Sequence, residues 1–254
     1  MLLEAKGLRK EFGGLIAIND LSFNVDEGEI VGLIGPNGSG KTTVFNVICG
    51  RHRLSEGQVI FKGIDTTGFK AHTMAKKGMV RTFQTASLLR QMTLFENVML
   101  ACHLVAKPRL LHALLGTYHF KENEKMSEAR AIQMLELVGL DSLKDEVMEN
   151  IPYGHQRALG IAMALAADPV LLLLDEPVAG MNVEETTNTV KLIRRIRDGG
   201  VTILVIEHDM RMIMGVCDRL IAISCGQKIA EGRPDEIRSN EAVIEAYLGR
   251  SYAS

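Results

Sequence analysis

Several hydrophobic positions of this chain gather in short continuous runs. Three runs consist almost entirely of Val, Ile and Leu: residues 30–34, 170–174 and 201–206. Apolar runs of four to eight residues are typical of strands that a parallel sheet buries on both faces. The pattern therefore predicts three central strands.

Other segments surround these strands. Shorter β-rich segments predict further strands: 58–61 at a sheet edge after a turn at Glu56-Gly57, 80–84, and 220–224 with 227–231 as a hairpin around Cys225-Gly226. Helices are expected over 42–50 and about 184–198, with glycine stops after each, and a polar helix closes the chain. The order of strands and helices predicts an α/β fold.

The pattern changes between about residues 88 and 150, where β-branched runs become scarce. Apolar residues recur there at near-helical spacing, with charges between them: Met126, Ala129, Ile132, Leu135 and Val138. We expect a helical lobe of residues 88–154 inserted into a core of residues 1–87 and 155–254, all within one domain. The least regular part, 107–121, predicts a loop.

Composition narrows the class of protein. The 254 residues carry a net charge of −2, which does not favour a nucleic-acid partner. The first residues lack the pattern of a signal peptide, and no apolar stretch reaches 18 residues. Any membrane role is therefore expected to come through a partner. The four cysteines form no C-x-x-C pair and predict small buried thiols in a reducing compartment.

A complete phosphate-binding motif, G-x-x-x-x-G-K-[ST], lies between the first predicted central strand and the first helix. It comprises Gly35, Pro36, Asn37, Gly38, Ser39, Gly40, Lys41 and Thr42, with Thr43 counted as a further nucleotide contact. The glycines let backbone N–H groups turn toward anionic oxygens, and the helix N-terminus adds its positive dipole. Lys41 can reach the β- and γ-phosphates of ATP, and Thr42 can ligate Mg²⁺. Both flanks argue against a chance glycine loop.

Acidic and imidazole groups follow the other two central strands. Asp175 and Glu176 come directly after four leucines and before Pro177, which argues against an ordinary solvated turn. The carboxyl edge of a parallel sheet places such acids beside the phosphate loop. Asp175 is expected to hold Mg²⁺ and Glu176 to polarise the attacking water. His208 also ends a strand, which favours a γ-phosphate contact over a structural role.

The segment 151–157, Ile-Pro-Tyr-Gly-His-Gln-Arg, resembles the signature of ABC transporter ATPases, usually written LSGGQ. The resemblance spans essentially the whole chain. It implies a P-loop NTPase core with an inserted helical lobe and N-terminal antiparallel β elements. It also implies that two subunits sandwich two ATP molecules, so that Tyr153, Gly154 and His155 contact the γ-phosphate bound to the opposite subunit.

The same resemblance assigns further positions. Gln84 matches the glutamine that senses Mg²⁺ and the γ-phosphate between core and lobe. Phe12 matches the aromatic residue that stacks on adenine, and a buried core phenylalanine is the equal alternative. Residues 178–182 match the loop that crosses the dimer interface.

Three positions depart from the family pattern. Pro152 replaces the usual serine of the signature, so one hydroxyl and one N–H toward the γ-phosphate are missing, although proline fits a first helical turn. His155 stands where glutamine is usual, and Asn182 replaces the usual aspartate of the interface loop. These changes bear on turnover rate more than on family.

Finer resemblance indicates the high-affinity branched-chain amino-acid importers. It rests on Phe12-Gly13-Gly14-Leu15, on 80–84 (Val-Arg-Thr-Phe-Gln), on 206–210 (Ile-Glu-His-Asp-Met) and on the insert around 107–121, which is similar to the larger ATPase subunit of such systems. The implied partners are membrane permeases, an identical or homologous ATPase subunit and, indirectly, a substrate-binding protein. The chain is then expected to be peripheral to the cytoplasmic face of the cell membrane.

The groove that receives the permease is expected beside Gln84. Apolar residues there could line the groove or, as the equal alternative, pack within the lobe: Leu88, Leu89, Met92, Leu94 and Phe95.

Several alternatives stay open or are set aside. Related ATPases serve urea and amide importers and lipopolysaccharide exporters, while translation or repair ATPases and non-hydrolysing regulatory modules fit less well. Met210, Met212 and Met214 do not share a helix face, which favours core packing over metal binding. The spacing of His103, His112 and His119 fits no zinc site, so we interpret them as surface residues.

Overall fold

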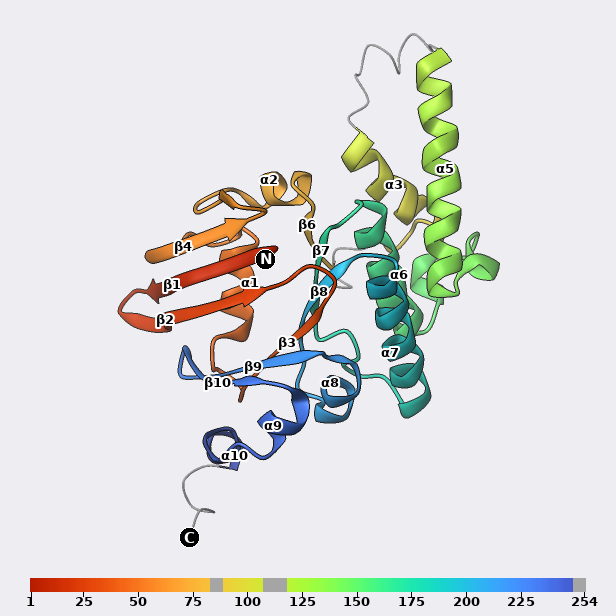
Figure 1. The fold of residues 1–254 in the computed structure, drawn as a ribbon. Coiled ribbons are helices and arrows are strands. Elements are labelled where there is room, and N and C mark those ends of the chain that lie inside the picture. Colours follow the sequence, from red (N-terminus) through yellow and green to blue (C-terminus); the bar gives the residue numbers. More distant parts are fainter. Residues whose placement is uncertain (83–88, 107–117, 249–254) are drawn as a thin grey trace.

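The computed structural model describes residues 1–82, 89–106 and 118–248 and contains two β-sheets (Figure 1). The larger sheet has six strands in the order β10-β9-β3-β8-β7-β6. Their bounds are β3 (Ile30–Ile34), β6 (Met79–Arg81), β7 (Leu171–Asp175), β8 (Thr202–Ile206), β9 (Arg219–Ser224) and β10 (Gln227–Gly232). All neighbouring pairs run parallel except β9 and β10, which form the predicted hairpin. The three predicted central strands are confirmed as β3, β7 and β8.

The central strands of this sheet are buried on both faces, as their continuous apolar runs predict. Alternate residues enter two separate cores: in β7, Leu172 and Leu174 face one cluster, and Leu171 and Leu173 face the other. The first core lies under the helices that cover residues 153–166, 183–198 and 210–216. The second core lies between the two sheets.

The smaller sheet is antiparallel, with the order β2-β1-β4-β5, and covers the second core. Its strands are β1 (Leu3–Phe12), β2 (Leu15–Val25), β4 (Glu56–Phe61) and β5 (Ile64–Asp65). The edge position predicted for 58–61 is wrong, because the two-residue strand β5 pairs with β4 on its outer side. Helix α1 (Lys41–Ile48) places Val44 and Phe45 in the core between the sheets, and α2 (Ala71–Lys76) follows β5.

Helices α3 (Leu94–Ala106), α5 (Tyr118–Val138) and α6 (Tyr153–Ala166) pack against one another beside the sheet (Figure 1). Two short 3-10 turns, η2 (Asp141–Leu143) and η3 (Met148–Asn150), connect α5 to α6. Leu94, Leu135 and Leu159 of these helices share one apolar cluster with Leu172 of β7. The boundaries at 88 and 154 stay a prediction. The loop predicted for 107–121 is wrong at its end, since α5 begins at Tyr118, and residues 107–117 lie outside the described part.

Up to residue 248, the C-terminal third adds four helices: α7 (Val183–Asp198), α8 (Met210–Val216), α9 (Pro234–Arg238) and α10 (Glu241–Leu248). Asn182 caps α7, since its side chain accepts from the backbone N–H of Glu185 and the Glu185 carboxylate accepts from the N–H of Asn182. The prediction of a single polar helix at the end of the chain is wrong, because two helices form and α10 exposes Ile244 and Leu248. Met212 is buried and its two neighbouring methionines pack against the same core, as predicted.

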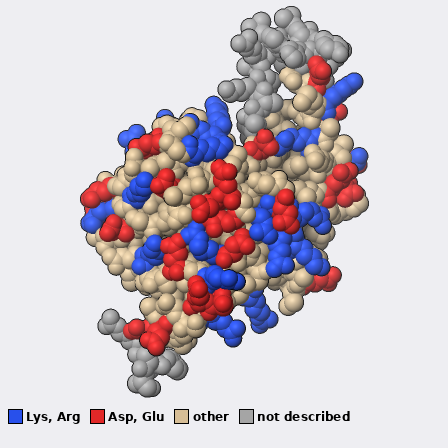
Figure 2. All heavy atoms as spheres, in the orientation of Figure 1, with Lys and Arg blue, Asp and Glu red and all other residues tan. Residues whose placement is uncertain are grey.

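The surface carries acidic and basic groups close together on the face seen in Figure 2. Among the helices of the described ranges, none combines the length and the hydropathy needed to span a bilayer. Three cysteines are buried, as predicted, whereas Cys225 is exposed because it occupies the tip of the β9–β10 hairpin.

Candidate nucleotide-binding site

The predicted site residues meet at one edge of the six-stranded sheet. Because β3, β7 and β8 are parallel neighbours, their carboxyl ends lie side by side. The phosphate loop follows β3, Asp175 ends β7 with Glu176 next to it, and His208 follows β8 at a distance of two residues. The fold thus gathers into one place three groups that are far apart in the sequence.

The phosphate loop is held tightly between two neighbouring segments. The backbone N–H of Gly226, in the β9–β10 turn, donates to the carbonyl oxygen of Ser39 at 3.0 Å. Gly40 has φ 106°, and a Cβ added there would lie 2.5 Å from the carbonyl oxygen of Ala17 in β2. A Cβ added at Gly35 would lie 2.1 Å from the carbonyl oxygen of Ile223. Only glycine therefore fits these two positions.

Lys41 lies under this loop, with its side chain almost wholly buried. Its Nζ donates to the carbonyl oxygens of Gly35, at 2.7 Å, and of Pro36, at 2.9 Å. Burial lowers the pKa of Lys41, and the negative charge of Glu176 partly opposes this effect. The ammonium group is thereby held at the inner side of the loop, where the motif requires it.

One polar atom in the loop lacks a partner. Within the described residues, Ser39 Oγ is buried and forms no hydrogen bond. Burying a hydroxyl without a partner costs free energy, so such an atom in a native structure calls for an explanation. A phosphate group in the cradle is the explanation that the surrounding glycines and Lys41 favour. The residues present therefore fit a bound nucleoside triphosphate.

Asp175 is engaged by an arginine that the sequence did not single out. The guanidinium of Arg81, at the end of β6, forms an ion pair with the Asp175 carboxylate, and both side chains are about nine-tenths buried. Arg81 Nη1 also donates to Asn46 Oδ1 of α1 at 2.7 Å. Arg81 thus links the strand that leads toward Gln84, the phosphate-loop helix and the predicted metal ligand.

Glu176 and His208 face each other across the ends of β7 and β8. His208 Nδ1 lies 3.7 Å from Glu176 Oε1, and both side chains are about half exposed. Glu176 has φ 47°, which is unusual for a residue with a side chain. Its backbone N–H donates to the carbonyl oxygen of Ile206 at 2.9 Å, which helps to hold this conformation. Both side chains are therefore accessible to a molecule bound at the loop.

Arg157 connects the signature segment to the Asp175-Glu176 corner. It lies on α6, whose first turn carries Tyr153, Gly154 and His155. Its guanidinium donates to the carbonyl oxygen of Glu176 at 3.0 Å and to the Tyr153 hydroxyl at 2.8 Å. Sequence reasoning missed this arginine, although its place within the signature was visible.

Phe12 is the last residue of β1 and precedes the β1–β2 turn. Its side chain is 41% exposed, which does not fit the alternative of a buried core phenylalanine. The ring of His52 meets it edge to face at 5.4 Å between centroids, and Lys10 Nζ lies 4.6 Å from its centroid. Stacking on adenine stays a prediction for this residue.

Some predicted positions lie outside the described residues. These are Gln84, Leu88 and His112, and the side chain of His119. The described part of the predicted permease groove contains Leu94, which is buried, and Leu89, which is 43% exposed. His103 is partly exposed and lies 3.8 Å from Glu124, as expected for a surface residue.

The C-terminal helix α10 also reaches the phosphate loop. Burial raises the pKa of Tyr247, and a hydrogen bond from the backbone of Gly35 works against this effect. No sequence pattern pointed to this contact, because the two residues are separated by most of the chain.

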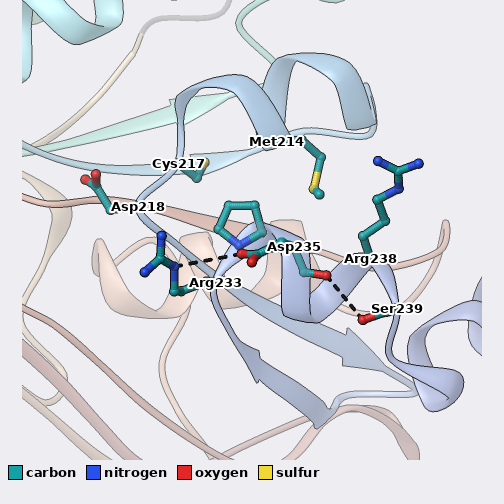
Figure 3. Close-up of a pocket in the computed structure, with 8 residues that line it drawn as sticks. Met214, Cys217, Asp218, Arg233, Asp235, Arg238 and Ser239 are labelled. Atoms are coloured by element: carbon teal, nitrogen blue, oxygen red, sulfur yellow. Dashed lines mark hydrogen bonds and ion pairs between the residues drawn. The ribbon is translucent and has the colours of Figure 1, made fainter.

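A separate cavity of about 1010 Å³ lies between α8 and α9 and is lined by Met214, Cys217, Asp218, Arg233, Pro234, Asp235, Arg238 and Ser239 (Figure 3). Asp218 accepts a hydrogen bond from the backbone N–H of Ile30, the first residue of β3. This cavity therefore lies toward the amino end of the strand whose carboxyl end carries the phosphate loop. It is not the site described above.

Comparison with known proteins decides the family. The family model described as ABC transporter matches residues 18–179, which include the phosphate loop, the signature and the Asp175-Glu176 pair. The chain belongs to the ABC transporter ATP-binding family. A second model, described as branched-chain amino acid ATP-binding cassette transporter, matches residues 227–253.

Curated relatives extend over the full chain. The high-affinity branched-chain amino acid transport ATP-binding proteins LivG of Salmonella typhimurium and BraF of Pseudomonas aeruginosa are 42% and 40% identical, each over 98% of both chains. The lipopolysaccharide export system ATP-binding protein LptB of Escherichia coli is 34% identical over 98% of both chains.

Solved ABC cassettes share the fold. The ADP conformation of MJ1267, an ATP-binding cassette of an ABC transporter, has a TM-score of 0.85 and 31% identity, with 98% of each chain covered. A nucleotide-free ATP-binding cassette from an ABC transporter has a TM-score of 0.86 and 31% identity, with 98% of this chain and 99% of that one covered. The predicted fold, a P-loop NTPase core of the ABC type with antiparallel N-terminal strands, is confirmed.

Proposed function

We propose that this chain is the ATP-hydrolysing subunit of an ABC importer for branched-chain or related amino acids. The observation that carries the hydrolytic part is the convergence of Lys41, Asp175, Glu176 and His208 at the carboxyl ends of neighbouring parallel strands. The importer part is supported by the identity to LivG and BraF, which exceeds that to LptB, and by the match over 227–253. Lipopolysaccharide export is the second candidate.

The chain's own groups divide the work of nucleotide binding. The loop from Gly35 to Thr43 surrounds the phosphates, and Lys41 neutralises their charge from the inner side. Phe12 stacks on the adenine. Mg²⁺, when bound, neutralises charge that develops on the phosphate oxygens.

Oxygen ligands for Mg²⁺ are available at the same edge of the sheet. Thr42, which is exposed at the start of α1, Asp175 at the end of β7, and Gln84 are the residues we assign to it. Hydroxyl, carboxylate and amide oxygens suit a hard cation of this kind. Arg81, on β6, forms an ion pair with the Asp175 carboxylate, so this carboxylate is already oriented before nucleotide binds.

Hydrolysis requires a positioned water. Glu176 is half exposed beside the loop. As the residue that positions the water, it accepts a hydrogen bond from the water with its carboxylate and so orients it. His208 contacts the γ-phosphate from the neighbouring strand end. The positive φ of Glu176 turns the chain sharply after β7 and is fixed by the hydrogen bonds from Arg157 and to Ile206.

The signature segment acts on the nucleotide of a second ATPase subunit, identical or homologous. Tyr153, Gly154 and His155 present the N-terminus of α6 to that γ-phosphate. Pro152 supplies neither hydroxyl nor N–H there, so this contact is weaker than with serine. Closure of the dimer changes the conformation of the membrane permeases. The chain is peripheral to the cytoplasmic face of the cell membrane. A substrate-binding protein acts from the other side of that membrane.

Mg·ATP turnover, measured together with light scattering, tests the hydrolytic proposal. Glu176→Gln is expected to lose turnover and to accumulate ATP-dependent dimers, because ATP binds but is not hydrolysed. Glu128→Gln, a change of the same chemistry at an exposed position of α5, is the matched control and should behave as the parent. Equal turnover in Glu176→Gln and the parent would refute the role of Glu176.

Uptake of radiolabelled leucine by cells that carry Lys41→Met in place of the natural chain tests the importer proposal. Loss of uptake with an intact outer membrane supports amino-acid import. Unchanged leucine uptake together with a defect in surface lipopolysaccharide would instead identify the chain as an exporter subunit.

A further inference from the structure

Glu207 is a wholly buried carboxylate next to the site, and the roles described above do not use it. Its Oε1 accepts a hydrogen bond from the backbone N–H of Val178 at 3.0 Å. Its Oε2 accepts from the N–H groups of His208, at 2.8 Å, and Asp209, at 3.2 Å. Each oxygen thus serves a different segment of the chain.

The two segments have separate functions. Val178 begins the loop 178–182 after β7, which is predicted to cross the dimer interface. His208 and Asp209 follow β8, and His208 Nδ1 itself lies 3.6 Å from Glu207 Oε2. One side chain therefore joins the interface loop to the predicted γ-phosphate contact without passing through the nucleotide.

A carboxylate is required for this arrangement. Burying a charge is costly unless hydrogen bonds compensate it, and within the described ranges no lysine or arginine pairs with Glu207. Three N–H donors need a group that accepts at both oxygens, which an ionised carboxylate does and an amide does not. An apolar residue would leave three backbone donors without this partner, the buried one of Val178 and the part-buried ones of His208 and Asp209.

We propose that Glu207 is a positioning residue that couples the loop 178–182 to His208, so that contact with the second subunit fixes His208 for hydrolysis. The inference rests on the proposed function, because it requires an ATP-dependent dimer. It adds a residue that acts through others and touches neither ATP nor water.

Glu207→Gln separates the two halves of this bridge. The amide oxygen is expected to face the two donors of His208 and Asp209, since leaving two donors unpaired costs more than leaving one. The amide NH₂ then faces the N–H of Val178, and that single hydrogen bond is lost. The substitution has the same shape, so the protein should fold and should keep its affinity for ATP as a monomer.

Hydrogen exchange followed by mass spectrometry gives the first readout. In Glu207→Gln, amide exchange in 178–181 is expected to become roughly tenfold faster, while exchange at 208–210 stays as in the parent. Loss of protection in both segments together with a lowered Tm would show a merely structural role and overturn the proposal. Unchanged exchange at 178–181 would also overturn it.

Dimer formation gives the second readout, in the Glu176→Gln background. Adding Glu207→Gln is expected to raise the ATP concentration needed for dimers by roughly tenfold. Adding Glu128→Gln, the same change at an exposed position of α5, should leave that concentration near the value for Glu176→Gln alone. Equal dimerisation with and without Glu207→Gln would overturn the coupling. If Glu176→Gln alone forms no ATP-dependent dimer, the proposed function fails instead, and the two failures are distinguishable.

Discussion

The guanidinium of Arg81 pairs with the carboxylate of Asp175, and this pair lies almost entirely out of solvent. A second nitrogen of Arg81 holds Asn46 of α1, and its guanidinium lies 5.8 Å from the ring centre of Phe45. The predicted metal ligand is therefore neutralised by a cation of the protein itself. Arg81, at the end of β6, thus contacts two other elements at the nucleotide site, β7 and α1.

Arg81→Met is expected to lower the free energy of unfolding by about 3 kcal/mol, because it leaves the Asp175 carboxylate buried without its partner. Millimolar Mg²⁺ should restore part of this loss, since the cation can replace the lost charge. Thermal unfolding with and without Mg²⁺ measures both effects. Arg81→Met/Asp175→Asn, the control, should show no response to Mg²⁺, and an equal response in both proteins would contradict the explanation.

Lys41 makes stability depend on pH. Its pKa in the folded chain lies below the ordinary 10.5, so between the two values the unfolded chain binds more protons at this residue. The free energy of unfolding of the parent, minus that of Lys41→Met, should therefore increase as the pH rises across this interval. Urea unfolding of both proteins between pH 7.5 and 10 tests the sign, and a constant difference between them would show that the burial of Lys41 has no such effect.

Gly40→Ala is expected to destabilise the protein more than Gly38→Ala. Both glycines have positive φ, but a Cβ at Gly40 would press on the Ala17 carbonyl, while a Cβ at Gly38 would meet nothing within 4 Å. We expect the free energy of unfolding, measured with urea, to fall by about 2–4 kcal/mol in Gly40→Ala and by about 1–2 kcal/mol in Gly38→Ala. Equal losses would mean that the loop moves away from β2 at little cost.

Arg157→Met is expected to lower kcat roughly tenfold with little change in KM, because the Glu176 backbone loses a charge-assisted hydrogen bond while the phosphate loop is untouched. Tyr153→Phe removes only the hydroxyl partner of Arg157 and should retain most of the activity. Steady-state hydrolysis of both variants measures the contrast. A larger loss in Tyr153→Phe would place the effect in the signature segment instead.

The central strands and the phosphate loop could be predicted because each depends on local signals. Four leucines followed by Asp175 and Glu176 specify both a buried strand and its acidic end, and the structure places β7 within one residue of the prediction. The two-residue strand β5 has no such signal, so β4 was wrongly placed at an edge. Exposed apolar side chains on α10 likewise contradicted the expectation of a polar helix.

The partners of the site residues could not be predicted, because they follow from three-dimensional packing. Arg81 and Asp175 are 94 positions apart, and only the parallel pairing of β6 with β7 makes them neighbours. Glu207 stands beside His208 in the sequence, yet its burial and its bond to Val178 depend on where the loop after β7 runs. A single sequence carries no signal for such contacts.

The hairpin tip that supports the phosphate loop also provides an attachment point for spectroscopic probes. Cys225 is exposed, whereas Cys49, Cys102 and Cys217 are buried, so a thiol-reactive fluorophore should label the folded chain once. Its neighbour Gly226 bonds directly to Ser39 of the loop. A dye at this natural cysteine would therefore report nucleotide arrival and departure in real time, with no engineered residue in the protein.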